Sequence, residues 1–255
     1  MARRIVVTSG KGGVGKTTCS LLLGLNLANM GVKVVILDVD VGLNNLDVVA
    51  GIDMRINYDL IEVVEHRCRL KQALIKSDHN PQLYFLPCTN MYQCNAVTKE
   101  GIKEVLDELD KDFNYIIIDC PAGIGDEFLR AVFYANEALI VTTPHLIAIR
   151  DAGKVANLLC GYQLSNVGLV VNRVRQDFVA KRLMLSPHQI AQSLKLPLIG
   201  VIRESQEITL LSSECGDLCA VNDVASDFLE LAKNVHSLGV ISNKPSFLDI
   251  KIRRG

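Results

Sequence analysis

The amino-acid sequence predicts an α/β fold in which a mostly parallel, twisted sheet is covered by helices on both faces. Short runs rich in β-branched residues alternate with longer segments of helical periodicity, which is the pattern of parallel strands joined by helices. The strand runs are almost continuously apolar, so they are expected to be buried on both faces. The predicted strands cover residues 5–7, 34–37, 83–86, 115–118, 139–141, 167–171 and 198–202. Polar residues that follow these strands should line a ligand crevice.

A glycine-rich segment after the first strand narrows this prediction to the three-layer P-loop NTPase fold. Residues 10–17 have the sequence Gly-Lys-Gly-Gly-Val-Gly-Lys-Thr and match the phosphate-binding pattern Gly-x-x-x-x-Gly-Lys-Thr. The glycines let successive backbone amides point at phosphate oxygens, so the segment predicts ATP binding. The nucleotide-binding residues predicted here are Gly10, Lys11, Gly12, Gly13, Val14, Gly15, Lys16, Thr17 and Thr18.

Three side chains of this loop have distinct expected roles. Lys16 would neutralise the β- and γ-phosphates, and the Thr17 hydroxyl would hold Mg²⁺ at the start of a helix whose positive dipole end faces the phosphates. Lys11 is a second lysine, inside the glycine run. From the loop alone, Lys11 is either a further phosphate contact or a solvated surface lysine.

The second predicted strand ends in two aspartates on alternate residues, Asp38 and Asp40. Their mutual repulsion is costly unless a cation, a lysine or bound water lies between them. We therefore expect Asp38 to help hold Mg²⁺ and Asp40 to position the water that attacks ATP, with residues 42–47 as a mobile switch. The alternative interpretation is a helix-capping turn.

The predicted strand at residues 115–118 ends in Asp119, the arrangement of a Walker B carboxylate that reaches Mg²⁺ directly or through its water ligands. The expected magnesium ligands are therefore Thr17, Asp38 and Asp119. The sequence Pro-Ala-Gly follows at residues 121–123 and resembles a second switch, in which the Gly123 amide would sense the γ-phosphate.

Composition favours one globular domain that stays in the cytoplasm. With 255 residues, 49% of them hydrophobic, the chain is long enough for a sizeable core. We expect an ATPase domain at residues 1–237 and a tail at 238–255. The net charge of −1 supplies no basic field, so no nucleic-acid partner is expected. The apolar run after Arg4 is too short for a signal peptide.

Lys11 and the strand-end aspartates together make the chain resemble the deviant Walker A ATPases, the ParA/MinD family. The sequence Gly-Leu-Asn-Asn-Leu-Asp at residues 42–47 resembles the MinD branch, and the resemblance covers residues 2–237. It implies an ATP-dependent homodimer in which Lys11 contacts the partner's phosphates, so that Lys11, Lys16 and Asp40 form the catalytic set. It also implies adenine contacts from Asn172 and Arg173, a MinC-like division inhibitor and an activating partner.

MinD relatives end in a short amphipathic helix that binds membrane, and this chain ends in the apolar and basic segment 247–255. Leu248, Ile250 and Ile252 alternate with charged residues, a period that suits a strand better than a helix. Two such tails on one dimer would bind membrane more tightly than one. The two open interpretations are a segment that holds the ATP-bound protein on the inner face of the cell membrane and an inert tail.

The resemblance leaves three other functions to compare with septum placement. A flagellar-placement ATPase of the FlhG type shares these motifs, and a ParA-like partition ATPase would bind DNA, which the near-neutral charge disfavours. An iron-sulfur carrier is disfavoured because none of the eight cysteines forms a Cys-x-x-Cys pair and the surroundings of Cys94 and Cys120 do not match cluster loops. The thiols are expected to be buried.

Overall fold

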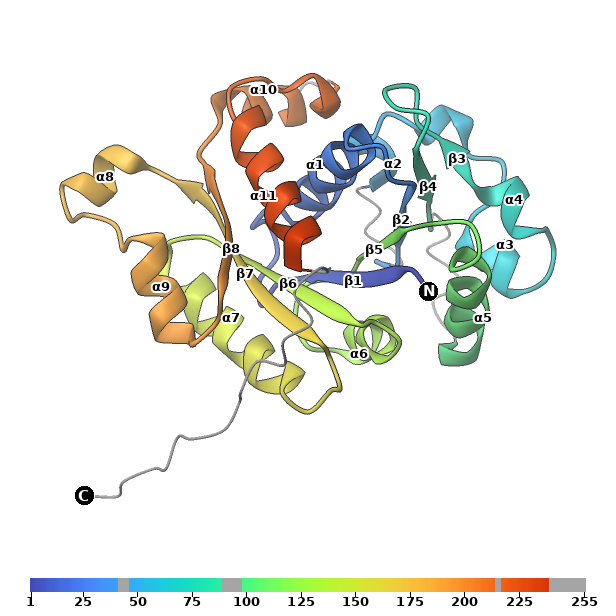
Figure 1. Cartoon of the computed structure of the whole chain (residues 1–255), viewed down its shortest axis with the longest axis horizontal. Coiled ribbons are helices and arrows are strands. Elements are labelled where there is room, and N and C mark those ends of the chain that lie inside the picture. Colours follow the sequence, from blue (N-terminus) through green and yellow to red (C-terminus); the bar gives the residue numbers. More distant parts are fainter. Residues whose placement is uncertain (41–45, 89–97, 214–216, 239–255) are drawn as a thin grey trace.

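The computed structural model describes residues 1–40, 46–88, 98–213 and 217–238, and its centre is an eight-stranded sheet (Figure 1). The strands are β1 Arg3–Thr8, β2 Val34–Asp38, β3 Ile75–Lys76, β4 Leu83–Leu86, β5 Tyr115–Asp119, β6 Glu137–Thr142, β7 Asn166–Val174 and β8 Leu198–Arg203. Their order is β3-β4-β2-β5-β1-β6-β7-β8, and every pair is parallel except β3 with β4. The predicted α/β class is confirmed.

Helices and short 3₁₀ turns connect the strands. The helices are α1 Lys16–Asn29, α2 Leu46–Val49, α3 Leu60–Val64, α4 Leu70–Ala73, α5 Lys99–Leu109, α6 Asp126–Phe133, α7 Leu146–Leu159, α8 Gln176–Ala180, α9 Pro187–Leu194, α10 Gln206–Ser213 and α11 Ala225–Leu238, with 3₁₀ turns η1 Asp53–Arg55 and η3 Leu218–Ala220. No helix among the described residues is long and apolar enough to cross a membrane.

The alternation of side chains along the strands produces two separate cores, one on each face of the sheet. On β5, Ile116 and Ile118 pack into the core covered by α3 to α7 and α9, whereas Ile117 packs into the core covered by α1 and α11. Figure 1 shows α1 and α11 side by side over the same face, and the two helices are in contact. The predicted three layers are therefore present.

All the predicted strands are found, but β3 was not predicted. It has only two residues, buried Ile75 and exposed Lys76, which pair antiparallel with β4. Two residues carry no periodic signal, so tertiary pairing alone defines this strand. Residues 41–45, which hold most of the predicted switch, Cys94 and the tail from residue 239 lie outside the described residues.

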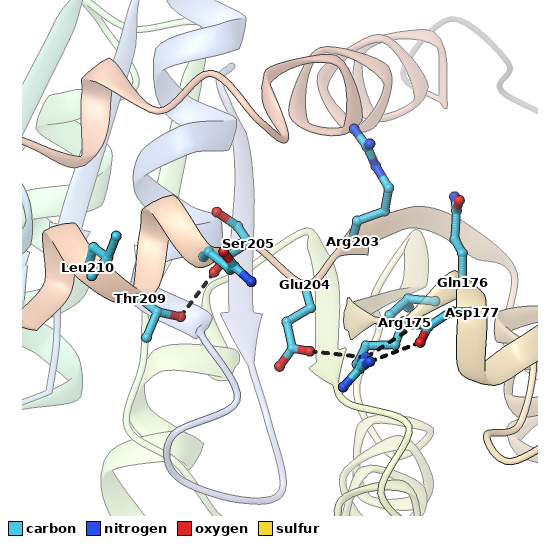
Figure 2. Close-up of a pocket in the computed structure, with 10 residues that line it drawn as sticks. Arg175, Gln176, Asp177, Arg203, Glu204, Ser205, Thr209 and Leu210 are labelled. Atoms are coloured by element: carbon cyan, nitrogen blue, oxygen red, sulfur yellow. Dashed lines mark hydrogen bonds and ion pairs between the residues drawn. The ribbon is translucent and has the colours of Figure 1, made fainter.

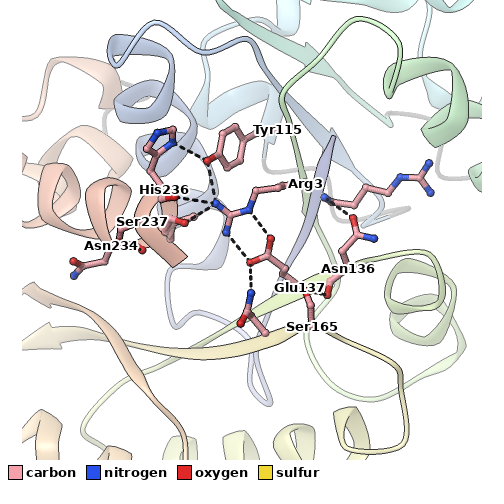
Figure 3. A network of polar contacts seen from close by, with 11 residues as sticks. Arg3, Tyr115, Asn136, Glu137, Ser165, Asn234, His236 and Ser237 are labelled. Carbon is pink, nitrogen blue, oxygen red and sulfur yellow. Dashed lines mark hydrogen bonds and ion pairs between the residues drawn. The ribbon is translucent and has the colours of Figure 1, made fainter. Parts of the chain in front are cut away.

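A polar network fastens the end of α11 to the amino ends of the central strands (Figure 3). Arg3 pairs with Glu137 through two nitrogens, at 2.6 and 2.7 Å, and donates to the Tyr115 hydroxyl and the Val235 carbonyl. The Tyr115 hydroxyl in turn lies 2.8 Å from Nδ1 of His236. Arg3 thereby connects β1, β5, β6 and α11 at the amino ends of these strands, whereas the phosphate-binding loop lies at their carboxyl ends.

Candidate nucleotide-binding site

The phosphate-binding loop joins β1 to α1 at the point where the strand order of the sheet reverses. β1 lies between β5 and β6, and the chain crosses from it by α1 to β2 on the far side of β5. Parallel sheets bind ligands outside the carboxyl ends of their strands at such a switch point. The loop follows β1, and Asp38 and Asp119 are the last residues of β2 and β5, so the structure brings these predicted residues to the same end of neighbouring strands.

The backbone of the loop leaves the start of α1 open toward a ligand. Gly13 and Gly15 have φ angles of 75° and 92°, in the left-handed region that favours glycine. Gly15 is the N-cap of α1, and no side chain caps this helix in the described structure. The first amides of α1 and the positive end of its dipole are therefore available to an anion.

Neighbouring elements hold the loop tightly on two sides. A Cβ atom at Gly10 would lie 2.2 Å from the backbone carbonyl carbon of Asp151 on α7, and one at Gly15 would lie 2.5 Å from Nδ2 of Asn172. The amide of Asn172 donates to the Val14 carbonyl at 2.8 Å, and its oxygen accepts from the Arg173 N–H at 2.9 Å. Asn172 is 7% exposed. Asn172 therefore supports the loop directly. Its predicted contact with adenine would use the amide N–H and the oxygen lone pair that these two hydrogen bonds leave available.

Asp38 and Asp119 lie opposite each other at the ends of β2 and β5, and each is 2% exposed. Burial and the neighbouring Asp119 carboxylate raise the pKa of Asp38 well above its usual range. Burial also raises the pKa of Asp119, although Thr17, Lys16 and Ser20 oppose the shift. Ionising both of these neighbouring buried carboxyls is unfavourable. A divalent cation bound between them would stabilise their charged forms.

The donors around these carboxylates fit Mg²⁺, which prefers oxygen ligands. Ser20 donates to Oδ1 of Asp119 at 3.0 Å, and Thr17 forms a hydrogen bond with the same carboxylate. Ser20 was not predicted, yet it lies one helical turn after Lys16, on the same side of α1. That spacing was the available signal in the sequence.

Asp40 is partly buried beside this pair. Its backbone N–H donates to Oδ1 of Asp38 at 2.9 Å. Burial raises the pKa of the Asp40 carboxyl, and the charge of Lys16 works in the opposite direction. A backbone hydrogen bond thus links Asp40 to Asp38, and the charge of Lys16 favours the ionised form of the Asp40 carboxyl.

The two lysines of the loop lie in different environments. Lys16 is 9% exposed, whereas Lys11 is exposed and its side chain has no hydrogen-bond or ion-pair partner within the described part of the chain. The Ser9 hydroxyl donates to the Lys11 carbonyl at 2.8 Å, so the backbone of Lys11 is fixed while its ammonium group reaches solvent.

The Gly123 amide, predicted to sense the γ-phosphate, donates to the Ser9 carbonyl at 2.9 Å. Gly123 has a φ of 99°, which fixes this turn in a conformation suited to glycine. To contact a phosphate, the Gly123 N–H would exchange the Ser9 carbonyl for a phosphate oxygen.

A cavity of about 650 Å³ lies beyond Asn172 at the carboxyl ends of β7 and β8 (Figure 2). Its lining comes from residues 174–177 and 203–206 with Thr209 and Leu210. In Figure 2 Glu204 turns toward Arg175, and 3.8 Å separate the charged atoms. Arg203 forms an ion pair with Asp227 of α11 at 2.9 Å. Arg173 is exposed, with a φ of 57°, directly before this cavity. This is where a base attached to phosphates on the loop would be expected.

A phosphate-binding loop between β1 and α1, with carboxylates at the ends of the adjacent strands, defines the class as P-loop NTPase. The family described as "ParA: NUBPL iron-transfer P-loop NTPase" matches residues 1–236. The septum site-determining protein MinD of Synechocystis sp. is 44% identical over 214 residues, which cover 84% of this chain and 80% of that protein.

Two solved structures share the fold over nearly the whole chain. MinD in the MinC:MinD cell division complex of Aquifex aeolicus has a TM-score of 0.84 and 33% identity, with 99% of each chain covered. MinD of Pyrococcus horikoshii, complexed with Mg-ADP, has a TM-score of 0.82 and 29% identity, with 96% of this chain and 100% of that chain covered. The chain belongs to the MinD branch of the ParA/MinD family of P-loop NTPases.

Gly10 and Gly12 form a matched pair that tests the packing of the loop. Gly10→Ala should lower the free energy of unfolding by about 1–3 kcal/mol, because its Cβ would meet the backbone of Asp151. Gly12→Ala should change it by less than about 0.5 kcal/mol, because no atom lies within 4 Å of the added Cβ. Urea unfolding without nucleotide measures both values. Equal losses in the two variants would contradict the packing of the loop on α7.

Asp38→Asn should stabilise the protein without nucleotide or Mg²⁺. The pKa of Asp38 is raised in the folded state, so this carboxyl lowers stability progressively as the pH rises above the unfolded pKa. Asparagine removes that charge and retains an acceptor for the Asp40 N–H. The expected gain at neutral pH is on the order of 1 kcal/mol.

Urea unfolding with and without Mg²⁺ and ADP measures this trade-off. Ligand should stabilise the wild type and stabilise Asp38→Asn much less. Asp112→Asn, at an exposed position, is the control and should change neither quantity. A destabilised Asp38→Asn variant would mean that Asp38 is not electrostatically strained.

Proposed function

We propose that this chain is a MinD-like ATPase that dimerises with ATP, binds the membrane in that state and recruits a MinC-like division inhibitor. ATP hydrolysis, stimulated by an activating partner, would release the dimer and so regulate where the division septum forms. The names of the relatives support septum placement, and the MinC:MinD complex of Aquifex aeolicus supports the inhibitor as partner.

The observation that carries this proposal is the contrast between Lys16 and Lys11. Lys16 is buried beside the strand-end carboxylates, where it would neutralise the phosphates bound by its own chain. Lys11 belongs to the same loop, yet its ammonium group is exposed and unpaired within the described part of the chain. An exposed cation at the mouth of a phosphate site is suited to a nucleotide held by a second copy of the chain.

In this mechanism the backbone amides of residues 12–17 hold the phosphates of ATP, and Lys16 neutralises their charge. Mg²⁺, held by Thr17, Asp38 and Asp119, would neutralise the charge that develops on the phosphate oxygens. Asp40 orients the attacking water by accepting its hydrogen bond. Lys11 of the partner copy stabilises the negative charge of the transition state, so hydrolysis requires the dimer.

Lys11→Ala should bind Mg-ATP with nearly unchanged affinity and hydrolyse it about 100-fold more slowly, because one cationic contact to the transition state is lost. Lys16→Ala should instead bind Mg-ATP much more weakly. Fluorescent-nucleotide titration and phosphate release in the presence of anionic vesicles separate the two effects. Lys111→Ala, at an exposed position far from the loop in sequence, is the control. Hydrolysis by Lys11→Ala at the wild-type rate would exclude the proposed role in the dimer.

The membrane step is tested by sedimentation with anionic vesicles. The full-length protein should sediment with vesicles in ATP and remain in solution in ADP, because ATP brings two tails together on one dimer. A chain that ends at Ser242 keeps every described residue and should remain in solution in both. Equal sedimentation of the two chains would remove the tail from the proposal, and salt-sensitive binding to DNA instead of vesicles would favour a partition function.

A further inference from the structure

Three side chains with the chemistry of metal ligands meet on the surface away from the phosphate-binding loop. His79 lies in the connection between β3 and β4, and Asp217 and Cys219 lie on either side of Leu218 in η3. Their ligand atoms all lie within 4.8 Å of one another, and Nε2 of His79 is 3.2 Å from Oδ2 of Asp217. Two segments separated by more than a hundred residues thus supply a nitrogen, an oxygen and a sulfur.

Local hydrogen bonds orient the Asp217 and His79 segments. The Cys219 N–H donates to Oδ1 of Asp217 at 2.9 Å, while Oδ2 of Asp217 faces His79. The backbone N–H of His79 donates to the hydroxyl of Ser77 at 3.2 Å, and Ser77 is 7% exposed. Leu218 is 1% exposed and anchors η3 in the core. These contacts fix the backbone of the two segments that carry the three side chains.

The combination of imidazole, thiolate and carboxylate suits Zn²⁺ better than Mg²⁺ or Ca²⁺, which prefer oxygen alone. In a tetrahedral zinc site the ligand atoms lie about 3.3–3.8 Å apart, so a small contraction of this cluster suffices. A cavity of about 240 Å³ adjoins His79 and Asp217, which leaves room for water as a fourth ligand.

The charged neighbours of the cavity leave the three ligands free to bind a cation. Arg55 also lines the cavity, but its guanidinium pairs with Asp78 at 2.7 Å and donates to the Lys76 carbonyl at 2.7 Å. Arg55 and Asp78 therefore neutralise each other, and Asp78 stands outside the ligand set. Asp217 remains as the anionic partner of His79.

We propose that His79, Asp217 and Cys219 form a binding site for a zinc-class divalent ion, with water as the fourth ligand. On binding, the Cys219 thiol releases its proton to solvent and the sulfur coordinates as thiolate. The ion would clamp the β3–β4 connection to η3. Because η3 contacts α1, which begins at the phosphate-binding loop, the clamp would stabilise the face of the sheet that α1 covers.

Cobalt, a spectroscopic substitute for zinc, tests the site in the full-length protein with Mg²⁺ in excess to occupy the nucleotide carboxylates. One equivalent of Co²⁺ should produce a sulfur-to-cobalt charge-transfer band, and Zn²⁺ should abolish that band. His79→Ala, Asp217→Asn and Cys219→Ser should each weaken Zn²⁺ binding by about tenfold or more. Asp217→Asn keeps the acceptor for the Cys219 N–H and so preserves the turn.

Two matched controls exclude incidental binding. His66→Ala removes an exposed histidine that also lies near a carboxylate, with 3.9 Å to Glu104, and Cys160→Ser removes an exposed thiol. Both should bind Zn²⁺ as the wild type does. Zn²⁺ should raise the midpoint of thermal unfolding of the wild type and of the two controls, but not of the three ligand variants. The proposal is overturned if the wild type gives no thiolate band, if the band persists in Cys219→Ser, or if the controls lose affinity equally. Should Cys219→Ser not fold, unchanged Zn²⁺ affinity in His79→Ala and Asp217→Asn would overturn it.

Discussion

The electrostatic conflict between Asp38 and Asp119 is the constraint on which the site depends. The register of β2 and β5 places the two carboxylates opposite each other, where each is 2% exposed. Removing charge from water is costly, and two like charges in one buried site cost more. A bound cation converts this repulsion into attraction. The central strands thus pay in stability for their affinity toward a charged ligand, as expected for a functional site.

The phosphate-binding loop is packed against its neighbours at Gly10 and Val14 and exposed at Lys11. Asn172 of β7 fixes Val14, and the backbone of Asp151 on α7 leaves no space beside Gly10. The Lys11 side chain has no such restraint and reaches solvent. The loop therefore packs on both β7 and α7.

Local patterns predicted most of the fold and the centre of the site. The apolar strands, the glycine loop and Asp119 are each encoded by neighbouring residues, so periodicity and motif spacing reveal them. The short strand β3 was not predicted, because it is defined by its pairing with β4 and not by any pattern in its own two residues. Asn172 was predicted as a contact for adenine, which stays a prediction, and only the fold shows that its amide donates to the Val14 carbonyl, 158 residues away in sequence.

The sequence by itself determined the seven apolar strands, the phosphate-binding loop and the aspartates at the strand ends, because these depend on side-chain periodicity and on short spacings. Only the tertiary structure decided the β2–β5 register that sets Asp38 directly opposite Asp119, and which other distant groups meet: Asn172 with the loop, and His79 with Asp217 and Cys219. Such meetings depend on strand order and register, which follow from the simultaneous burial of two cores rather than from any local segment.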